Sequence, residues 1–177
     1  LSMLFCGHAF LVRFAAAAFT NLTRDHLDYH ATLEEYFDAK MRLFEELLPP
    51  GAPAVINTDN AFSAEVTARC RARGLKIFSV GKLGADLKLL STRRDGLGQQ
   101  LILQGGQKTH SVYLPLVGDF QTSNALVAAG LVLATGGEDV LVMHALESLQ
   151  GAKGRLELVG KSKTGASIFV DYAHTPD

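Results

Sequence analysis

Three short apolar runs predict strands in the first half of the chain. Residues 15–22 (AAAAFTNL) form the first run, which ends with the polar pair Thr20 and Asn21. Pro53–Asn57 and residues 76–80 form the second and third runs. Apolar runs of this length between polar, Gly or Pro residues are typical of strands buried in a sheet.

Helical patterns separate these runs. Thr32 and Glu35 have the spacing of a capping box, and they predict a helix that continues to about residue 48, before Pro49 and Pro50. Residues 61–73 predict a second helix, which Gly74 closes. Because strands and helices alternate, the sequence predicts an α/β fold with a mostly parallel sheet flanked by helices.

The pattern changes between residues 87 and 116. Three runs of strand-forming residues are separated by Asp95-Gly96-Leu97-Gly98 and by Gly105-Gly106, which predicts a small antiparallel β-meander. The rest of the chain predicts helices over 120–135 and 139–149, and strands over 156–159 and 167–172. We expect the last strand to be buried and to end in a polar run that begins at residue 171.

Composition and charge exclude several classes of protein. The 177 residues are 47% hydrophobic, which suits one substantial core, and the net charge of -1 argues against a basic nucleic-acid-binding module or an attraction to anionic membranes. The longest uncharged apolar run, residues 125–134, is far shorter than the roughly 20 residues that cross a bilayer. Cys6 and Cys70 lack the spacing of a zinc cluster or a disulfide framework, so we expect the protein to be in the reducing cytoplasm.

Lys40 occupies an apolar face of the first predicted helix. Leu33, Phe37, Phe44 and Leu47 have the spacing of one face, and position 40 falls between the two phenylalanines. One interpretation is a lysine whose stem packs while its ammonium group reaches solvent. The other is a desolvated amine that loses its proton and acts as a nucleophile, including toward carbon dioxide.

Two polar clusters lie where strands end, as ligand sites do in α/β folds. Residues 24–30 (RDHLDYH) bring together Asp25, His26, Asp28 and His30, which is compatible with metal binding but also with helix caps and surface ion pairs. Residues 170–177 (VDYAHTPD) place Asp and His after the last predicted strand. Arg155 lies at the start of the strand before it. The sequence contains no Gly-x-x-x-x-Gly-Lys-Ser/Thr phosphate loop.

In combination these stretches resemble the Mur ligases, the ATP-dependent amide ligases of peptidoglycan precursor synthesis, and most closely their MurE type. The resemblance covers about residues 14–177. It rests on separated stretches in the family's order: residues 20–22, 25–30, 36–40, 118–124, 154–157 and 171–177.

The resemblance implies a partial protein with three parts. Residues 14–153 would be part of the family's central ATPase domain, which is P-loop NTPase-like, with the antiparallel meander at 87–116. Residues 154–177 would be the junction and the first strand of the C-terminal domain. Residues 1–13 would be an unmatched N-terminal segment. We therefore expect the phosphate loop to precede residue 1 and this piece alone to be inactive.

The resemblance also implies roles for individual residues. Lys40 would be an N-carboxylated lysine whose carbamate is a magnesium ligand and takes part in catalysis, and His26 would be a second magnesium ligand. Asn124 would contact the adenine of ATP and Arg155 its phosphates. Asp171 and His174 would line the nucleotide site at the domain junction.

The implied reaction forms an amide in cell-wall synthesis. ATP, with Mg²⁺, phosphorylates the carboxylate of a UDP-N-acetylmuramoyl dipeptide, and the amine of an amino acid attacks the acyl phosphate. The amino acid is meso-diaminopimelate or L-lysine, and we expect the former. We also expect a cytoplasmic monomer without nucleic-acid or membrane partners.

Some residues depart from the family pattern and keep other interpretations open. Cys6 and His8 stand where the family has substrate-binding Gln and Arg, and Gln121 replaces an Asn near the adenine. One alternative is a degenerate copy that binds nucleotide weakly or not at all. Another is a small metallohydrolase that uses the cluster at 25–30.

Overall fold

The computed structural model describes residues 13–22 and 32–172. A six-stranded sheet in the order β1-β2-β3-β4-β5-β6 forms its centre. The strands are β1 (Ala17–Phe19), β2 (Pro53–Asn57), β3 (Lys76–Gly81), β4 (Leu87–Asp95), β5 (Gly98–Gly105) and β6 (Lys108–Leu114). The pairs from β1 to β4 are parallel, and β4, β5 and β6 are antiparallel. This confirms the predicted α/β class with its meander.

The meander continues the parallel sheet. β4 pairs with the end of β3 at Val80 and Leu87 and then forms a hairpin with β5. Asp95 pairs with Gly98 across one turn, and Gly105 pairs with Lys108 across the next. Both predicted turns therefore lie where the sequence places them.

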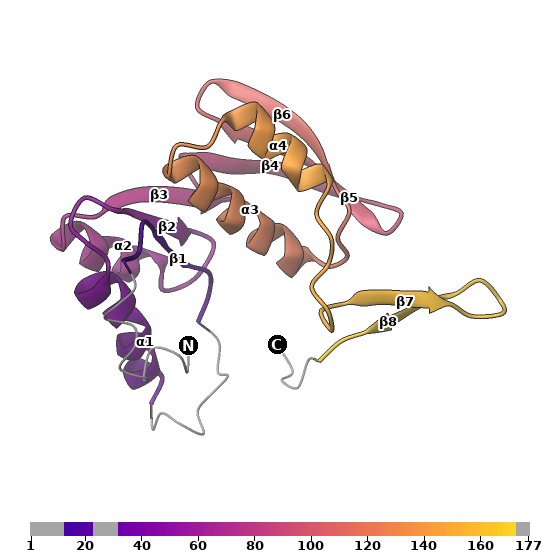
Figure 1. The fold of residues 1–177 in the computed structure, drawn as a ribbon, viewed down its shortest axis with the longest axis horizontal. Coiled ribbons are helices and arrows are strands. Elements are labelled where there is room, and N and C mark those ends of the chain that lie inside the picture. The colour runs from indigo at the N-terminus through magenta and orange to yellow at the C-terminus, as the bar shows by residue number, and fades with distance from the viewer. Residues whose placement is uncertain (1–12, 23–31, 173–177) are drawn as a thin grey trace.

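Helices cover both faces of the sheet (Figure 1). One face carries α1 (Leu33–Arg42) and α2 (Ser63–Ala72). The other carries α3 (Asp119–Ala134) and α4 (Asp139–Glu147). Each face of the sheet has its own hydrophobic core, and alternate side chains of β2 point into one or the other. Val55 packs with α3, whereas Ala54 and Ile56 pack with α1 and α2. None of the helices in the described ranges has the length and apolar character needed to cross a bilayer.

α3 lies unusually close to the sheet at Gly130. A Cβ atom built there would lie 2.8 Å from a Cγ1 atom of Val55 and from one of Val80. A larger residue would therefore push the helix away from the strands. This close approach fixes the depth at which α3, and the residues at its first turns, lie on the sheet.

The first helix confirms its predicted cap but ends differently. Thr32 accepts a hydrogen bond from the Glu35 backbone N–H at 3.1 Å, as the capping box predicts. After α1 the chain forms a π-helical turn, η3 (Leu43–Leu47), closed by a hydrogen bond of 3.0 Å from the Leu48 N–H to the Leu43 carbonyl. The wider turn moves the buried face by one residue. Leu48 is fully buried and Leu47 only partly, so the apolar face proposed through Leu47 is wrong at that position.

The expectation of a buried strand at 167–172 is also wrong. β7 (Glu157–Lys161) and β8 (Ser167–Val170) form a separate two-stranded antiparallel sheet near the beginning of α3 (Figure 1). Residues along β8 alternate between half-buried and exposed. A hairpin with only two strands buries little apolar surface, whatever its sequence.

Cys70 lies in the core between α2 and β2, fully buried. Burial raises the pKa of its thiol to about 11, with a smaller contribution from Glu45. The thiol is therefore protonated and unreactive at neutral pH. This agrees with a core packing role for Cys70.

Candidate functional site

A cavity of about 430 Å³ lies at the start of α3 and brings together two predicted nucleotide ligands, Asn124 and Arg155. Asn124 comes from the second turn of α3, and Arg155 comes from the segment that follows α4. Both side chains are exposed and therefore accessible to a ligand. The cavity is completed by Leu116, Phe120, Gln121, Ala125, Ala128, Leu149, Gln150, Gly151 and Ala152.

Gln121 connects the two walls of this cavity. Its side-chain amide donates a hydrogen bond of 3.3 Å to the Arg155 carbonyl, and the residue is buried. Gln121 therefore holds the 154–157 segment against α3. The family resemblance predicts Gln121 near the adenine. The structure places Gln121 on the cavity wall, with its amide nitrogen hydrogen-bonded to the Arg155 carbonyl.

Residues 154–157 and 171–172 form the junction below the cavity. The Leu156 N–H donates to Asp171 Oδ2 at 3.2 Å, and the Tyr172 N–H donates to the Gly154 carbonyl at 2.8 Å. Leu156 has a positive φ of 47°, which is uncommon for a residue with a branched side chain. Asp171 thus fixes the backbone next to Arg155.

Lys40 lies in a polar and aromatic environment at the end of β1. Its ammonium group donates to the Asn21 carbonyl at 3.0 Å and lies 4.8 Å from the ring centroid of Tyr36 and 5.8 Å from that of Phe19. The residue is half-buried. Oxygen atoms of Thr20 and Asn21 lie close together here, since the Thr20 hydroxyl and Asn21 Oδ1 are 3.3 Å apart.

Arg69 of α2 holds the helix that carries Lys40. It makes a bidentate contact with Glu45, at 2.6 and 2.8 Å, and a further contact of 2.5 Å with Asp38. The hydrogen bonds to Glu45, and secondarily the one to Asp38, raise the pKa of the Arg69 guanidinium above its ordinary value. The guanidinium carbon also lies 5.4 Å from the ring centroid of Phe37. Asp38 precedes Lys40 in the chain and Glu45 follows it, so these contacts hold the segment around Lys40 against α2.

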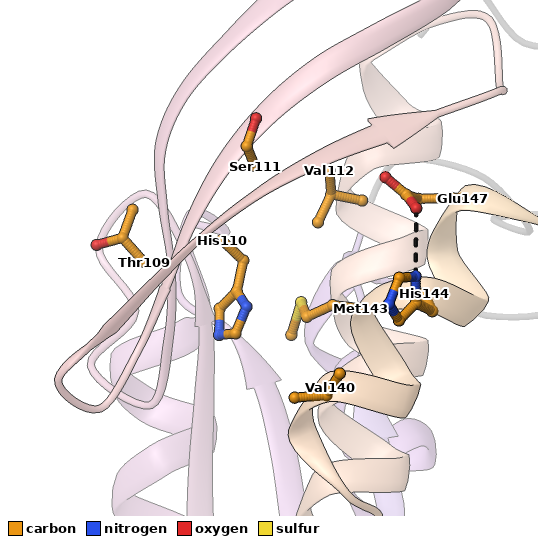
Figure 2. Close-up of a pocket in the computed structure, with 8 residues that line it drawn as sticks. All are labelled: Thr109, His110, Ser111, Val112, Val140, Met143, His144 and Glu147. Atoms are coloured by element: carbon orange, nitrogen blue, oxygen red, sulfur yellow. Dashed lines mark ion pairs between the residues drawn. The ribbon is translucent and has the colours of Figure 1, made fainter.

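A different cavity, of about 290 Å³, lies between β6 and α4 (Figure 2). His144 Nδ1 lies 3.6 Å from Glu147 Oε2, and Glu147 Oε1 accepts from the Tyr113 N–H at 3.3 Å. His110 Nε2 lies 3.1 Å from Asp139 Oδ2, without the alignment of a hydrogen bond. These groups serve to hold α4 on β6, and none of the predicted site residues lines this cavity.

The predicted site residues therefore form two groups in the structure. Asn124 and Arg155 share a cavity with Asp171 beside it, whereas Lys40 lies at the end of β1. His26 and His174, like the rest of the 25–30 cluster, Cys6 and His8, lie outside the described residues. Within 13–22 and 32–172, no group of three or more His, Cys, Asp or Glu side chains is placed to hold a metal ion.

Sequence reasoning missed several residues that line the cavity. Phe120 and residues 149–152 line the cavity but carry no chemical signature of a binding site. They reach the cavity because the segment after α4 lies beside the start of α3, an arrangement that becomes visible only in three dimensions.

Comparison with known proteins supports the family resemblance. The Mur ligase middle domain matches residues 7–132. The UDP-N-acetylmuramoyl-L-alanyl-D-glutamate--2,6-diaminopimelate ligase of Bradyrhizobium diazoefficiens is 50% identical over 170 residues, which is 94% of this chain and 35% of the relative. The Rhizobium meliloti protein of the same name is 51% identical over 166 residues, or 94% of this chain and 34% of the relative. The chain thus spans about a third of these relatives.

Solved structures share the fold. A structure of UDP-N-acetylmuramoyl-L-alanyl-D-glutamate--2,6-diaminopimelate ligase superposes with a TM-score of 0.77 at 30% identity, covering 93% of this chain and 34% of that one. The residues that match the family's middle domain include all six strands of the central sheet and most of α3. The chain therefore belongs to the Mur ligase family, and its residues 7–132 match the middle domain of that family.

Proposed function

We propose that the full-length protein containing this chain is an ATP-dependent ligase that adds meso-diaminopimelate to UDP-N-acetylmuramoyl-L-alanyl-D-glutamate. The observation that carries the proposal is the identity of about 50%, over 94% of the chain, to ligases of that name. The shared cavity of Asn124 and Arg155 supports it, because an amide and a guanidinium group are suited to a purine base and to phosphates.

The chain's own residues would bind and orient the nucleotide. The amide of Asn124 would hydrogen-bond the adenine, while Arg155 would neutralise charge on the phosphates. Asp171 would keep the Arg155 segment in place through the Leu156 N–H, and His174 would complete the lining of the junction. An arginine held in this way stabilises charge on a transferring phosphoryl group without rearranging during the reaction.

Lys40 and His26 would hold Mg²⁺. A carbamate on Lys40 would add anionic oxygen to an end of β1 that already presents oxygens of Thr20 and Asn21, and hard cations such as Mg²⁺ prefer oxygen ligands. When bound, the ion would supply positive charge to the phosphates. Arg69 would keep Lys40 in place through Asp38 and Glu45.

The proposed reaction has two steps. A carboxylate oxygen of the dipeptide attacks the γ-phosphorus of ATP, and ADP leaves. The amine then attacks the acyl carbon, loses a proton, and expels inorganic phosphate as the tetrahedral intermediate collapses. The protein contributes chiefly by positioning and by electrostatic stabilisation. We further propose that the full-length protein is a monomer. We also propose that it is cytoplasmic, because its substrates are small soluble molecules.

Assay of the full-length protein tests the proposed function. We expect continuous, multiple-turnover ADP release to require the dipeptide and meso-diaminopimelate together, with a ligated product of the matching mass. L-Lysine serves as the alternative amino acid, and the isolated 177-residue chain serves as the control. Because its sequence contains no phosphate loop, the isolated chain should bind ATP only in the millimolar range and should not turn over.

Other results would favour the alternative functions. A full-length protein that folds and shows no nucleotide binding would be a degenerate copy. Metal-dependent hydrolysis without ATP would favour the metallohydrolase instead. Equal or better product formation with L-lysine would overturn the choice of amino acid while leaving the ligase assignment intact.

A further inference from the structure

We propose that Gln99 is a positioning residue for the nucleotide cavity. This inference rests on the proposed function, and it concerns a residue on β5 that does not itself line the cavity. Gln99 is 2% exposed, so its amide must find all its hydrogen-bond partners inside the protein.

The Gln99 amide nitrogen holds the loop that leads into α3. It donates to the Leu116 carbonyl at 3.3 Å and to the Gly118 carbonyl at 3.0 Å. Leu116 is itself part of the cavity wall. The Gly118 carbonyl also accepts a hydrogen bond of 3.0 Å from the Gln121 N–H, in the first turn of α3. One side chain therefore connects the cavity wall to the beginning of the helix.

The Gln99 amide oxygen holds the helix itself. It accepts from the Thr122 hydroxyl at 3.0 Å, and Thr122 is also buried. A second hydroxyl, that of Thr92 on β4, lies at 3.3 Å. With its nitrogen and oxygen both bonded, the amide fixes loop, helix and sheet in one arrangement.

The loop that Gln99 holds has a demanding conformation. Gly118 has a φ of 98°, and a Cβ atom built there would lie 2.8 Å from the Phe120 ring and 2.9 Å from Leu156 Cδ1. The loop therefore brings the first turn of α3 close to the segment that carries Arg155. Without the Gln99 amide, the buried Leu116 carbonyl and the Thr122 hydroxyl lose this partner, and the Gly118 carbonyl keeps only the Gln121 N–H. The loop is then expected to rearrange to satisfy these groups.

A rearrangement of this loop would affect nucleotide binding in particular. Asn124 lies two residues beyond Thr122 on α3, and Arg155 is held to α3 through Gln121. A shift of the first turn would change the spacing between these two groups. Gln99 would thus set the width of the cavity, while Lys40 and its surroundings at the end of β1 would be unaffected.

The test compares Gln99→Met with Gln100→Met in the full-length protein. Both substitutions remove an amide from β5, but the Gln100 amide donates to the Ser111 hydroxyl at 2.9 Å, whereas the Gln99 amide donates to the Leu116 and Gly118 carbonyls. Nucleotide affinity is measured by calorimetric titration with a non-hydrolysable ATP analogue and Mg²⁺, and steady-state kinetics gives KM and kcat. We expect Gln99→Met to weaken analogue binding and raise KM for ATP at least about tenfold, with a smaller change in kcat. Gln100→Met should leave both near the unaltered values.

Thr122 supplies a second test if Gln99→Met does not fold. Thr122→Val removes the hydroxyl at nearly constant volume, and Thr122→Ser retains it. We expect the valine variant to weaken analogue binding and the serine variant to restore it.

Unchanged analogue affinity in folded Gln99→Met, or in Thr122→Val, would overturn the inference even if thermal stability fell, because that result means a purely structural role. If the unaltered protein does not bind ATP, the proposed function fails and the inference fails with it.

Discussion

Replacing Lys40 by alanine in the full-length protein is expected to reduce ligation by at least about a hundredfold, the loss typical of removing one group that stabilises transition-state charge. Alanine can neither form a carbamate nor ligate a metal ion, so added bicarbonate should not restore activity. The measurement is the rate of ADP release in the presence of dipeptide and amino acid. Mass spectrometry of the unaltered protein under bicarbonate should also show the carbamate on Lys40, a readout independent of activity.

Arg42→Ala is the matched control for this variant. Arg42 lies two residues further along the same helix but faces solvent, where it pairs with Glu46 at 3.0 Å. An exposed ion pair of this kind contributes little to stability. We expect Arg42→Ala to retain activity. Near-normal turnover of Lys40→Ala would contradict the carbamate assignment.

Replacing Phe44 by alanine is expected to destabilise the protein by about 3–5 kcal/mol, the cost of deleting a large buried aromatic side chain. Phe44 is 1% exposed, and its ring centroid lies 6.5 Å from that of Phe19 on β1. The cavity left behind would lie between η3 and the strand that ends beside Lys40. Chemical denaturation, followed by circular dichroism, measures the change in the free energy of unfolding.

Leu83→Ala provides the control for an apolar deletion at the surface. Leu83 is 76% exposed, so its truncation should change the free energy of unfolding by no more than about 0.5 kcal/mol. A loss for Phe44→Ala as small as that for Leu83→Ala would show that the η3 segment does not pack as the structure describes.

The sequence predicts those parts of the fold that depend on local patterns. The Thr32 cap, the strands at 53–57 and 76–80, and the two hairpin turns of the meander follow from short-range propensities and turn chemistry. The π-helical turn does not. Its wider spacing buries Leu48 in place of Leu47, and a pattern with the α-helical period cannot show where one residue is added.

The family resemblance names the residues of the candidate site, but the sequence does not show their arrangement. Asn124, Arg155 and Asp171 were found through a resemblance spread over separated stretches, and the structure adds that the first two share a cavity. Gln99 and Gln100 look equivalent in the sequence. Only the pleat of β5 turns Gln99 toward the loop before α3 and Gln100 toward Ser111, so the role of Gln99 depends on long-range packing.

Transfer of ¹⁸O tests the central claim most directly, namely that this chain is part of a ligase that activates a carboxylate as an acyl phosphate. The full-length protein is supplied with ATP, Mg²⁺, meso-diaminopimelate and a dipeptide substrate whose reacting carboxylate carries ¹⁸O in both positions. We expect one ¹⁸O atom in the inorganic phosphate for each amide formed, because the carboxylate oxygen that attacks ATP leaves with the phosphate. Label in AMP, or product formed without label in phosphate, would contradict the account.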